Sequence, residues 1–391
     1  MKLVSLLFCL LISLSSQVNA GTISGLVFTD ANGNGIRDKN ETGMKGVAVS
    51  DQVNVVVTDA NGFYQIAAAK GYGFVFITLP QGFKAVRSFY SKVDLDRGNS
   101  QVDFPLSKTM APTHFKFIHA SDIHIEEKSL DRMRKFQALV DSIKPEFVIV
   151  TGDLVADALR VSEKQASSLF EMYKTETQKI STPIWNAPGN HEIFGIERNL
   201  SQVSAQHPLY GKKMYRSYLG PDYYSFNYGG FHFVALNSLE YEDMWYYGSI
   251  DSLQREWLKK DLAAVPAAMP VITFQHVPFI SGMVSVAGYT ESGPGRTLER
   301  EKGELKLRHV VSNAHDVITI LQSHPFPLAL GGHHHARQRY FLETEGQQTR
   351  FEQSGAVVGP STQGGFKMPS GIVLYEVMDG EIDEGQFIVI R

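Results

Sequence analysis

The sequence is poor in cysteine, in long apolar runs and in clustered positive charge. Its single cysteine, Cys9, lies within the first twenty residues, so the rest of the chain has no disulfide and no thiolate metal ligand. No later apolar run approaches the ~20 residues that a membrane-spanning helix needs. Lys and Arg form no basic block and the formal net charge is -4, so nucleic acid is not expected as an obligate partner.

The first twenty residues have the pattern of a cleaved signal peptide. Lys2 gives a positive start, residues 3–14 are mostly apolar, and the segment ends in the small residues of Val-Asn-Ala at 18–20. The apolar run is too short to span a membrane. We therefore predict an exported protein, periplasmic or secreted, that its core and bound metal stabilise without disulfides.

Residues 21–110 are predicted to form a small all-β sandwich of transthyretin-like or immunoglobulin-like size. Apolar residues alternate with polar or smaller ones at residues 53–57, a turn sequence follows at 59–62, and further short strands are expected near residues 64–66 and 75–79. No long helical period interrupts this segment, which offers no catalytic residue.

Residues 113–391 are predicted to form a larger α/β domain with a mixed, two-layered sheet. Five apolar strands, each followed by polar residues, are expected at 115–120, 146–150, 183–187, 269–274 and 327–330, and two antiparallel strands at 223–239. Helices are expected at 129–143 and 251–265, the second with Gln254 as a possible capping partner of Asp251. The carboxyl ends of strands in an open α/β sheet converge on a crevice, so these polar residues are expected to meet there.

Seven side chains that bind metals well follow these five strands. They are Asp122, His124, Asp153, Asn190, His276, His333 and His335. A pair of ions ~3.5 to 4 Å apart needs one shared carboxylate, further oxygen donors and several imidazoles. Asp153 is placed to bridge, and Asp122 and His124 can bind one ion together. Such mixed ligands suit Mn, Fe or Zn, so two divalent transition-metal ions are predicted without a choice among them.

These motifs resemble those of the calcineurin-like metallophosphoesterases, whose pattern is D-x-H, G-D, G-N-H-D/E, a lone His, then G-H-x-H. The chain carries them in that order as residues 122–124, 152–153, 189–192, 276 and 332–335. The resemblance covers residues 113–391 and implies a four-layer α/β/β/α sandwich that hydrolyses phosphomonoesters or phosphodiesters. The front segment is similar to the β-sandwich ahead of the catalytic domain in exported bacterial members.

The resemblance also implies a role for each residue. Asp122, His124 and His335 would hold the first ion, Asn190, His276 and His333 the second, and Asp153 would bridge them. His191 would protonate the leaving oxygen. The substrate would be a phosphorylated small molecule or a glycan or lipid head group.

The chain departs from the family pattern beside His191. Many members orient this histidine with an acidic residue three positions after the bridging Asp, whereas this chain has Ala156 there; Asp157 and Glu192 stay open as orienting partners. Within residues 332–335, His334 is taken as a bystander. The remaining histidines of the mature chain are expected to be structural or surface residues: His114, His119, His207, His232, His309, His315 and His324.

A second metal pattern lies in the front segment. Residues 30–41 match a calcium-loop pattern with donors at Asp30, Asn32, Asn34, Asp38 and Glu41. The alternative is a polar turn between two strands, and the two interpretations weigh about equally. A rival function follows: a surface binding protein with a calcium-braced β-domain and an idle phosphoesterase fold.

Two further features have open interpretations. The aromatic stretch at residues 241–247 is either a substrate-facing rim or core packing. Arg198, Arg296 and Arg300 either grip phosphate oxygens or are solvated surface charges.

Overall fold

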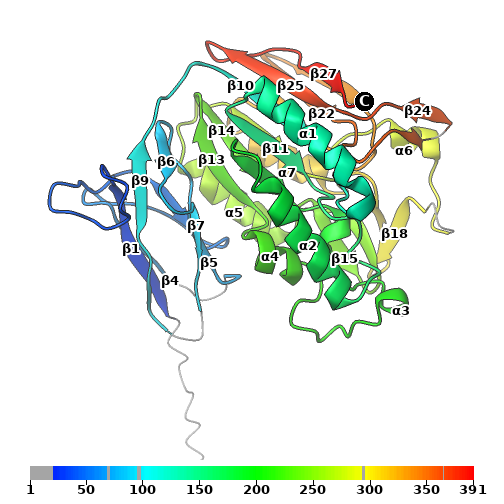
Figure 1. Ribbon diagram of the computed structural model, residues 1–391, viewed down its shortest axis with the longest axis horizontal. Coiled ribbons are helices and arrows are strands. Elements are labelled where there is room, and N and C mark those ends of the chain that lie inside the picture. The colour runs from blue at the N-terminus through cyan, green and yellow to red at the C-terminus, as the bar shows by residue number, and fades with distance from the viewer. Residues whose placement is uncertain (1–20, 68–70, 95–97, 293–295, 364) are drawn as a thin grey trace, which may run out of the picture.

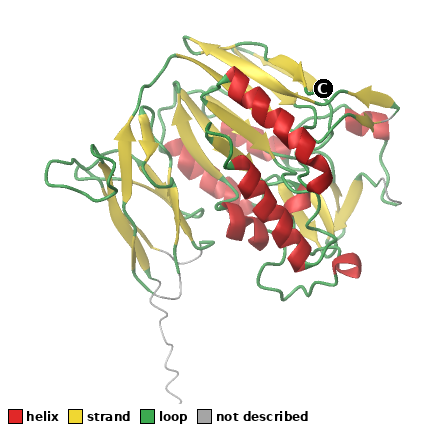
Figure 2. Ribbon diagram, viewed as in Figure 1, coloured by secondary structure: helices red, strands yellow, loops and turns green. Residues whose placement is uncertain are grey.

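The computed structural model describes residues 21–67, 71–94, 98–292, 296–363 and 365–391. The predicted signal peptide, residues 1–20, lies outside the described residues. The chain forms a front all-β part and a larger α/β part (Figures 1 and 2). None of the helices in these ranges is long and apolar enough to cross a membrane.

The front part is a sandwich of two sheets. One sheet has the order β4-β1-β9-β6, with the short β8 also pairing with β1, and the other has the order β3-β2-β5-β7. The strands are β1 (Thr22–Thr29), β2 (Ala48–Ser50), β3 (Val55–Val57), β4 (Phe63–Ala67), β5 (Phe74–Ile77), β6 (Phe83–Ala85), β7 (Tyr90–Lys92), β8 (Ser100–Gln101) and β9 (Phe104–Lys108). Alternate residues of β1, such as Ile23, are buried in a core that β4, β5 and β9 share, as a half-buried strand requires. The all-β prediction for this region is confirmed.

The larger part contains two six-stranded sheets. The first has the order β12-β11-β10-β25-β26 with β27 also on β25, and the second has the order β13-β14-β17-β20-β22-β21. The first is built from β10 (His114–Ala120), β11 (Phe147–Thr151), β12 (Ile184–Ala187), β25 (Gly371–Met378), β26 (Glu381–Ile382) and β27 (Gln386–Val389). The second is built from β13 (Tyr224–Tyr228), β14 (Phe231–Ala235), β17 (Val271–Phe274), β20 (Leu328–Gly331), β21 (Gln338–Thr344) and β22 (Gln347–Gln353).

Each sheet has a parallel centre and antiparallel additions. In the first sheet β10, β11 and β12 are parallel and β25 is antiparallel to β10. In the second sheet β14, β17, β20 and β22 are parallel, while β13 and β21 are antiparallel to their neighbours. The predicted mixed α/β fold is confirmed. The five predicted strands differ from the observed ones by only one or two residues at their ends.

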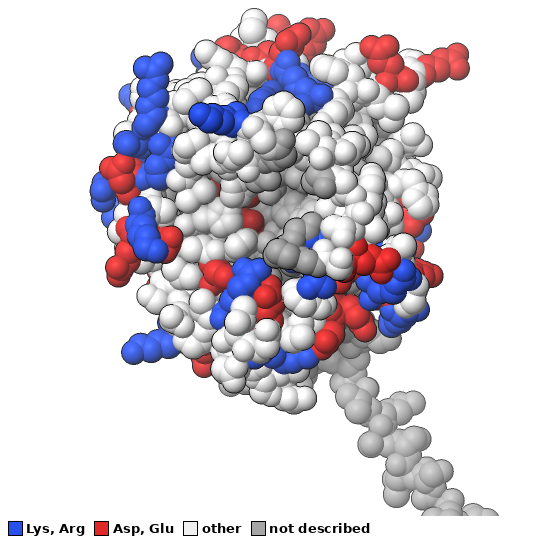
Figure 3. Space-filling view, turned by 90° about the vertical axis from the view of Figure 1, so that its right-hand side faces the viewer, with Lys and Arg blue, Asp and Glu red and all other residues white. Residues whose placement is uncertain are grey.

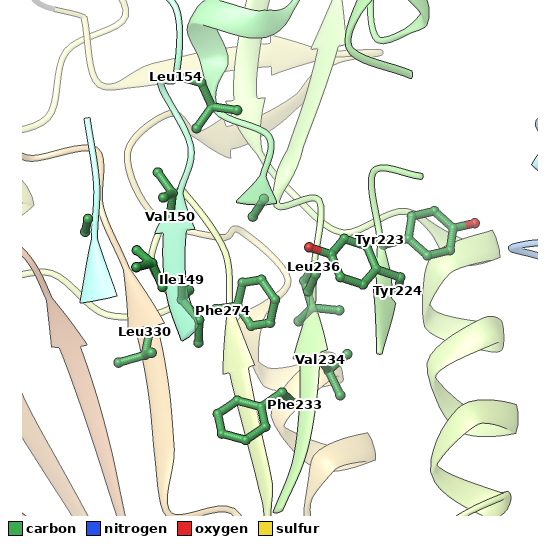
Figure 4. Close-up of a cluster of buried hydrophobic side chains, with 14 of the residues drawn as sticks. Ile149, Val150, Leu154, Tyr223, Tyr224, Phe233, Val234, Leu236, Phe274 and Leu330 are labelled. Atoms are coloured by element: carbon green, nitrogen blue, oxygen red, sulfur yellow. The ribbon is translucent and has the colours of Figure 1, made fainter. Parts of the chain in front are cut away.

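The two sheets pack face to face through aromatic side chains. Phe117 of β10 lies 5.8 Å from Phe233 of β14 between ring centroids, and Trp185 of β12 stacks on Phe226 of β13 at 4.1 Å. Figure 4 shows neighbouring apolar side chains of the same core, among them Val150 and Phe274. Because this interior is fully buried, the strands that carry the polar ends are held rigidly.

Helices cover the two outer faces, which gives the four layers (Figure 1). On the first sheet lie α1 (Leu130–Ile143), which follows the short η2 (Glu127–Ser129), and α2 (Glu163–Thr177); on the second lie α5 (Ser252–Ala263) and α7 (Ala314–Leu321). Asp251 caps α5 by accepting from the Gln254 backbone N–H at 2.7 Å. The Gln254 side chain does not complete a capping box: its amide exchanges two hydrogen bonds with the Asn237 backbone at 2.9 Å each.

Shorter elements connect these layers. They are η3 (Asn190–Glu192), α3 (Arg198–Ser201), α4 (Lys213–Leu219), α6 (Met283–Ala287) and three hairpins, β15 (Leu239–Glu242) with β16 (Trp245–Gly248), β18 (Leu298–Glu301) with β19 (Glu304–Leu307), and β23 (Ser361–Gln363) with β24 (Phe366–Met368).

Candidate metal centre

The predicted donors lie at the carboxyl ends of the parallel strands. The strand β10 starts beside the front part and runs away from it, so these ends point to the side of α6 and β18 (Figure 1). Figure 3 shows this face, which is hollowed near its centre and whose hollow is bordered mostly by uncharged side chains.

Asp122, His124, Asp153 and His335 form one group whose ligand atoms all lie within 4.8 Å of one another. His335 Nε2 is 3.2 Å from Asp122 Oδ1, and His124 Nε2 is 3.5 Å from Asp153 Oδ2. The Nε2 atoms of His124 and His335 face each other at 3.1 Å. The group is therefore compact enough to hold one ion.

Asp153, His276 and His333 form a second such group. His276 Nε2 lies 3.2 Å from Asp153 Oδ2 and 3.1 Å from His333 Nδ1. The side-chain oxygen of Asn190 is also 3.1 Å from His276 Nε2. All seven predicted donors thus meet at one place, and Asp153 belongs to both groups.

The backbone of this cluster is strained. Five of the seven donors have a positive φ: 54° at Asp122, 43° at His124, 49° at Asp153, 73° at His333 and 52° at His335. Residues with a Cβ adopt this left-handed region at an energetic cost, and such residues gather at functional sites. The sharp turns let successive strand ends aim their side chains at one point.

Glu192 holds two of these turns together. Its carboxylate accepts the backbone N–H groups of Gly189 at 2.6 Å, Asp153 at 3.0 Å, Leu154 at 2.8 Å and Val155 at 2.9 Å. The turns approach so closely that a Cβ on Gly189 would lie 2.1 Å from the Asp153 backbone nitrogen. Glu192 therefore fixes the loops and does not contact the His191 ring.

Carboxylates and imidazoles in this cluster shift one another's pKa values. Burial alone would raise the pKa of Asp122, but the neighbouring histidines, His335 foremost, hold it well below its usual range. Burial alone would lower the pKa of His276, yet Asp153 outweighs it and raises the pKa to about 9. The Asp122 carboxylate is therefore charged at neutral pH, and bound cations would displace the imidazole protons.

The donor set fits a pair of metal ions. The Oδ1 atom of Asp122 is buried, and among the described residues it has no hydrogen bond of normal geometry, although His335 Nε2 lies 3.2 Å away. In each group two imidazole nitrogens face each other at 3.1 Å, which suits two lone pairs directed at a common ion. A buried polar atom without a partner is costly unless something else satisfies it.

His191 lies at the edge of the first group. Its Nδ1 atom is 2.5 Å from the carbonyl oxygen of Ala156, and its Nε2 atom faces Asp153 Oδ2 at 3.9 Å. The orienting partner is thus a backbone carbonyl, whereas Asp157 pairs with Arg160 at 3.0 Å. Sequence reasoning missed this partner because a carbonyl has no side-chain signature.

One histidine that was expected to be structural lies beside the centre. His309 Nδ1 is 2.6 Å from His333 Nε2, and the two rings meet edge to edge with centroids 4.9 Å apart. His334 points away, with Nε2 3.0 Å from the His309 carbonyl oxygen, in agreement with its bystander assignment. No motif in the sequence distinguishes His309 from the other histidines.

The arginines and aromatic residues singled out in the sequence have partners within the protein. Arg198 pairs with Asp243, Arg300 with Glu291 at 2.9 Å, and Arg296 lies 3.4 Å above the Trp245 ring centroid. The stretch at residues 241–247 forms the β15–β16 hairpin, in which Tyr246 and Tyr247 are buried. Both features therefore make contacts within the protein, and their alternative roles toward a substrate stay predictions.

The front loop at residues 30–41 closes on its own carboxylates. Asp30 is buried and accepts the backbone N–H groups of Gly33 and Gly35 at 2.7 Å each. Glu41 accepts those of Ala31 at 2.8 Å and Asp38 at 3.0 Å. The amides of the two remaining predicted donors, Asn32 and Asn34, donate to Asp38 Oδ2 at 2.8 and 3.2 Å. The loop is thus closed by its own hydrogen bonds, and calcium binding stays a prediction.

Two family models match the sequence. The model described as "Calcineurin-like phosphoesterase" matches residues 115–337, and the model described as "N terminal of Calcineurin-like phosphoesterase" matches residues 31–109. No curated protein matches the chain in sequence.

Solved structures show weaker likeness. A dimetal phosphatase from Danio rerio is 14% identical, with a TM-score of 0.46, and covers 71% of this chain and 99% of its own. GAP50, the anchor in the inner membrane complex of Plasmodium, is 14% identical, with a TM-score of 0.42, and covers 71% and 85%. A protein from Thermus thermophilus is 12% identical, with a TM-score of 0.38, and covers 71% and 100%.

Proposed function

This chain belongs to the calcineurin-like phosphoesterase family, and we propose that it hydrolyses phosphomonoesters or phosphodiesters at a dinuclear metal centre. The observation that carries the proposal is that Asp153 belongs to two groups, each compact enough for one ion. Asp122, His124 and His335 would hold the first ion, Asn190, His276 and His333 the second, and Asp153 would bridge them. The mixed ligand set suits Mn, Fe or Zn. Two such ions supply an acidified water as nucleophile and positive charge for the phosphoryl oxygens.

His191 is the proposed proton donor to the leaving oxygen. The Ala156 carbonyl accepts from Nδ1, so Nε2 faces the site and carries the transferable proton when the ring is charged. Burial lowers the pKa of His191, and Asp153 acts in the opposite direction. The negative charge of a bound phosphoryl group would also raise this pKa, which favours the protonated ring when substrate is present.

Turnover of two kinds of ester tests this function. The metal-loaded protein should hydrolyse both nitrophenyl phosphates and alkyl phosphates. The His191→Ala variant should lose roughly 10² to 10⁴-fold in kcat on alkyl phosphates and much less on nitrophenyl phosphates, because nitrophenolate leaves without a proton. Inactivity of the wild-type protein with Mn, Fe and Zn would contradict the proposal, and an equal loss on both esters would remove His191 as the acid.

The substrate that we propose is a phosphorylated small molecule or a glycan or lipid head group. The mostly uncharged border of the hollow in Figure 3 and the net charge of -4 favour these substrates over a nucleic acid. Export to the periplasm or medium is proposed from residues 1–20 alone, and cell fractionation would test it.

We also propose that the loop at residues 30–41 binds calcium. Support comes from the spacing of its five predicted donors and from the burial of Asp30 and Glu41. Elemental analysis after dialysis should find about one calcium per chain, which the Asp30→Ala variant should lose while keeping its transition metals. If the wild-type protein binds no calcium when millimolar calcium is supplied, the proposal is wrong and the loop is a polar turn.

A further inference from the structure

His309 stands outside every motif of the proposed centre but touches one of its donors. It lies between β19 and α7, and its ring meets that of His333 edge to edge, with an angle of 29° between the ring planes. The short contact joins His309 Nδ1 to His333 Nε2. Only one proton can lie between these nitrogens, so the contact couples the tautomers of the two rings.

The protons can be assigned along this chain of contacts. His333 Nδ1 faces His276 and Asp153, and a nitrogen that binds a metal must be unprotonated. His333 therefore carries its proton on Nε2 and donates it to His309 Nδ1. His309 then carries its own proton on Nε2, which is 3.2 Å from the carbonyl oxygen of Arg296. Each donor in this arrangement meets an acceptor.

We propose that His309 is a positioning residue for the second metal subsite, where it accepts the Nε2 proton of His333 and so fixes the ring orientation and tautomer that leave Nδ1 free for the ion. The proposal rests on the dinuclear centre described above. His276 has a corresponding partner, since its Nδ1 lies 2.7 Å from the Thr151 carbonyl oxygen. Such hydrogen bonds orient metal-binding histidines and raise their basicity.

The segment around His309 is held firmly enough for this role. The backbone N–H of Arg308 donates to Thr297 at 2.8 Å, and that of Val311 to Pro278 at 3.0 Å. The Arg308 guanidinium lies 4.2 Å from the Tyr246 ring centroid, and that ring meets His333 edge to face at 6.1 Å. A partner fixed in this way can hold a metal ligand in one orientation.

Metal titration of matched variants tests the proposal. His309→Leu removes the acceptor but keeps the bulk, whereas His309→Asn can place Oδ1 where Nδ1 lies. His324→Leu is the control, because His324 lies in the protein interior but precedes β20 and so lies at the opposite end of that strand from His333. Each metal-free protein is titrated with Mn(II), and electron paramagnetic resonance reports free ions and spin-coupled pairs.

The wild-type protein and the control should bind two ions and give the signal of a coupled pair. His309→Leu should keep one tight site and weaken the other about 10 to 100-fold, with the coupled signal lost at low Mn(II), and His309→Asn should restore most of the affinity. The proposed role of His309 would be overturned if His309→Leu kept two sites of full affinity, or if the Leu and Asn variants were weakened equally. Neither result would contradict the dinuclear centre itself. Failure of the wild-type protein to bind two ions would overturn the dinuclear centre as well.

A second measurement does not depend on how the variants fold. In the Zn(II)-loaded wild-type protein, long-range ¹H–¹⁵N spectra of the imidazole rings report which nitrogen carries the proton. We expect the Nε2–H tautomer for both His309 and His333. A proton on Nδ1 of His309 would overturn the assignment.

Discussion

Asp122 and Asp222 are both fully buried in the α/β domain, but their surroundings differ. Asp222, at the junction with the front part, accepts two hydrogen bonds from Arg216 at 2.9 and 2.8 Å, one from Gln52 at 3.1 Å and one from Asn237 at 2.8 Å. Asp122, at the metal centre, has an oxygen without a hydrogen-bond partner among the described residues and a left-handed backbone. Side chains of the protein therefore satisfy the hydrogen bonding of Asp222, whereas one oxygen of Asp122 lacks such a partner and can bind a cation.

The contrast extends to the surroundings of each carboxylate. At the junction, Thr78 bonds Ser225 at 2.9 Å and the Trp257 indole donates to Ser50 at 3.0 Å, so both parts share buried hydrogen bonds. At the metal centre, pairs of imidazole nitrogens lie 3.1 Å apart, an arrangement that suits binding to a common metal ion. Buried polar groups thus stabilise the fold at the junction, whereas the strained backbone and the unpaired polar atom at the metal centre are typical of a functional site.

The largest expected effect comes from Asp153→Asn, which removes the bridging charge. Activity should fall on the order of 10⁴-fold, about 5 kcal/mol of lost transition-state stabilisation. Metal content should fall below two ions per chain, while the circular dichroism spectrum stays that of the wild type. Asp157→Asn is the matched control and should change kcat only a few-fold, since Asp157 pairs with Arg160. Two tightly held ions in Asp153→Asn would erase the distinction between the junction and the metal centre.

The next effect in size is expected from Arg216→Met, which should destabilise the fold but leave the catalytic activity unchanged. The variant leaves Asp222 buried without its cation, which should lower the free energy of unfolding by roughly 3 to 5 kcal/mol. Metal stoichiometry should be unchanged. Asp243→Ala, which breaks the exposed pair with Arg198, should cost only about 0 to 1 kcal/mol. Urea titration measures both, and equal costs for the two variants would contradict the account of the junction.

The smallest effect is the pH dependence of this stabilisation. Burial alone would raise the pKa of Asp222, but Arg216 outweighs it and lowers the pKa. A carboxyl with a lowered folded-state pKa adds stability above its unfolded pKa of about 3.9 and loses it as the pH falls through the folded-state value. The stability difference between wild type and Asp222→Asn should therefore be full at about pH 5.5 and shrink at lower pH. A difference that stays constant down to pH 2 would contradict this.

The sequence predicts the strands and the donors well because both are local signals. An apolar run such as residues 146–150 is a buried strand, and the polar residues after it must lie at the edge of the sheet. Sequence reasoning misses the side-chain partners that come together only in the tertiary structure. Gln254 fits a capping pattern but meets Asn237, His191 is oriented by a carbonyl, and His309 meets His333 only in the folded chain.

The central claim is that Asp153 is shared by two metal sites. An anomalous difference map from crystals grown with Mn(II) or Zn(II) tests it most directly. Two peaks are predicted, one on each side of Asp153, the first beside Asp122 and the second beside His276. A single peak, or two peaks that Asp153 does not join, would contradict the claim.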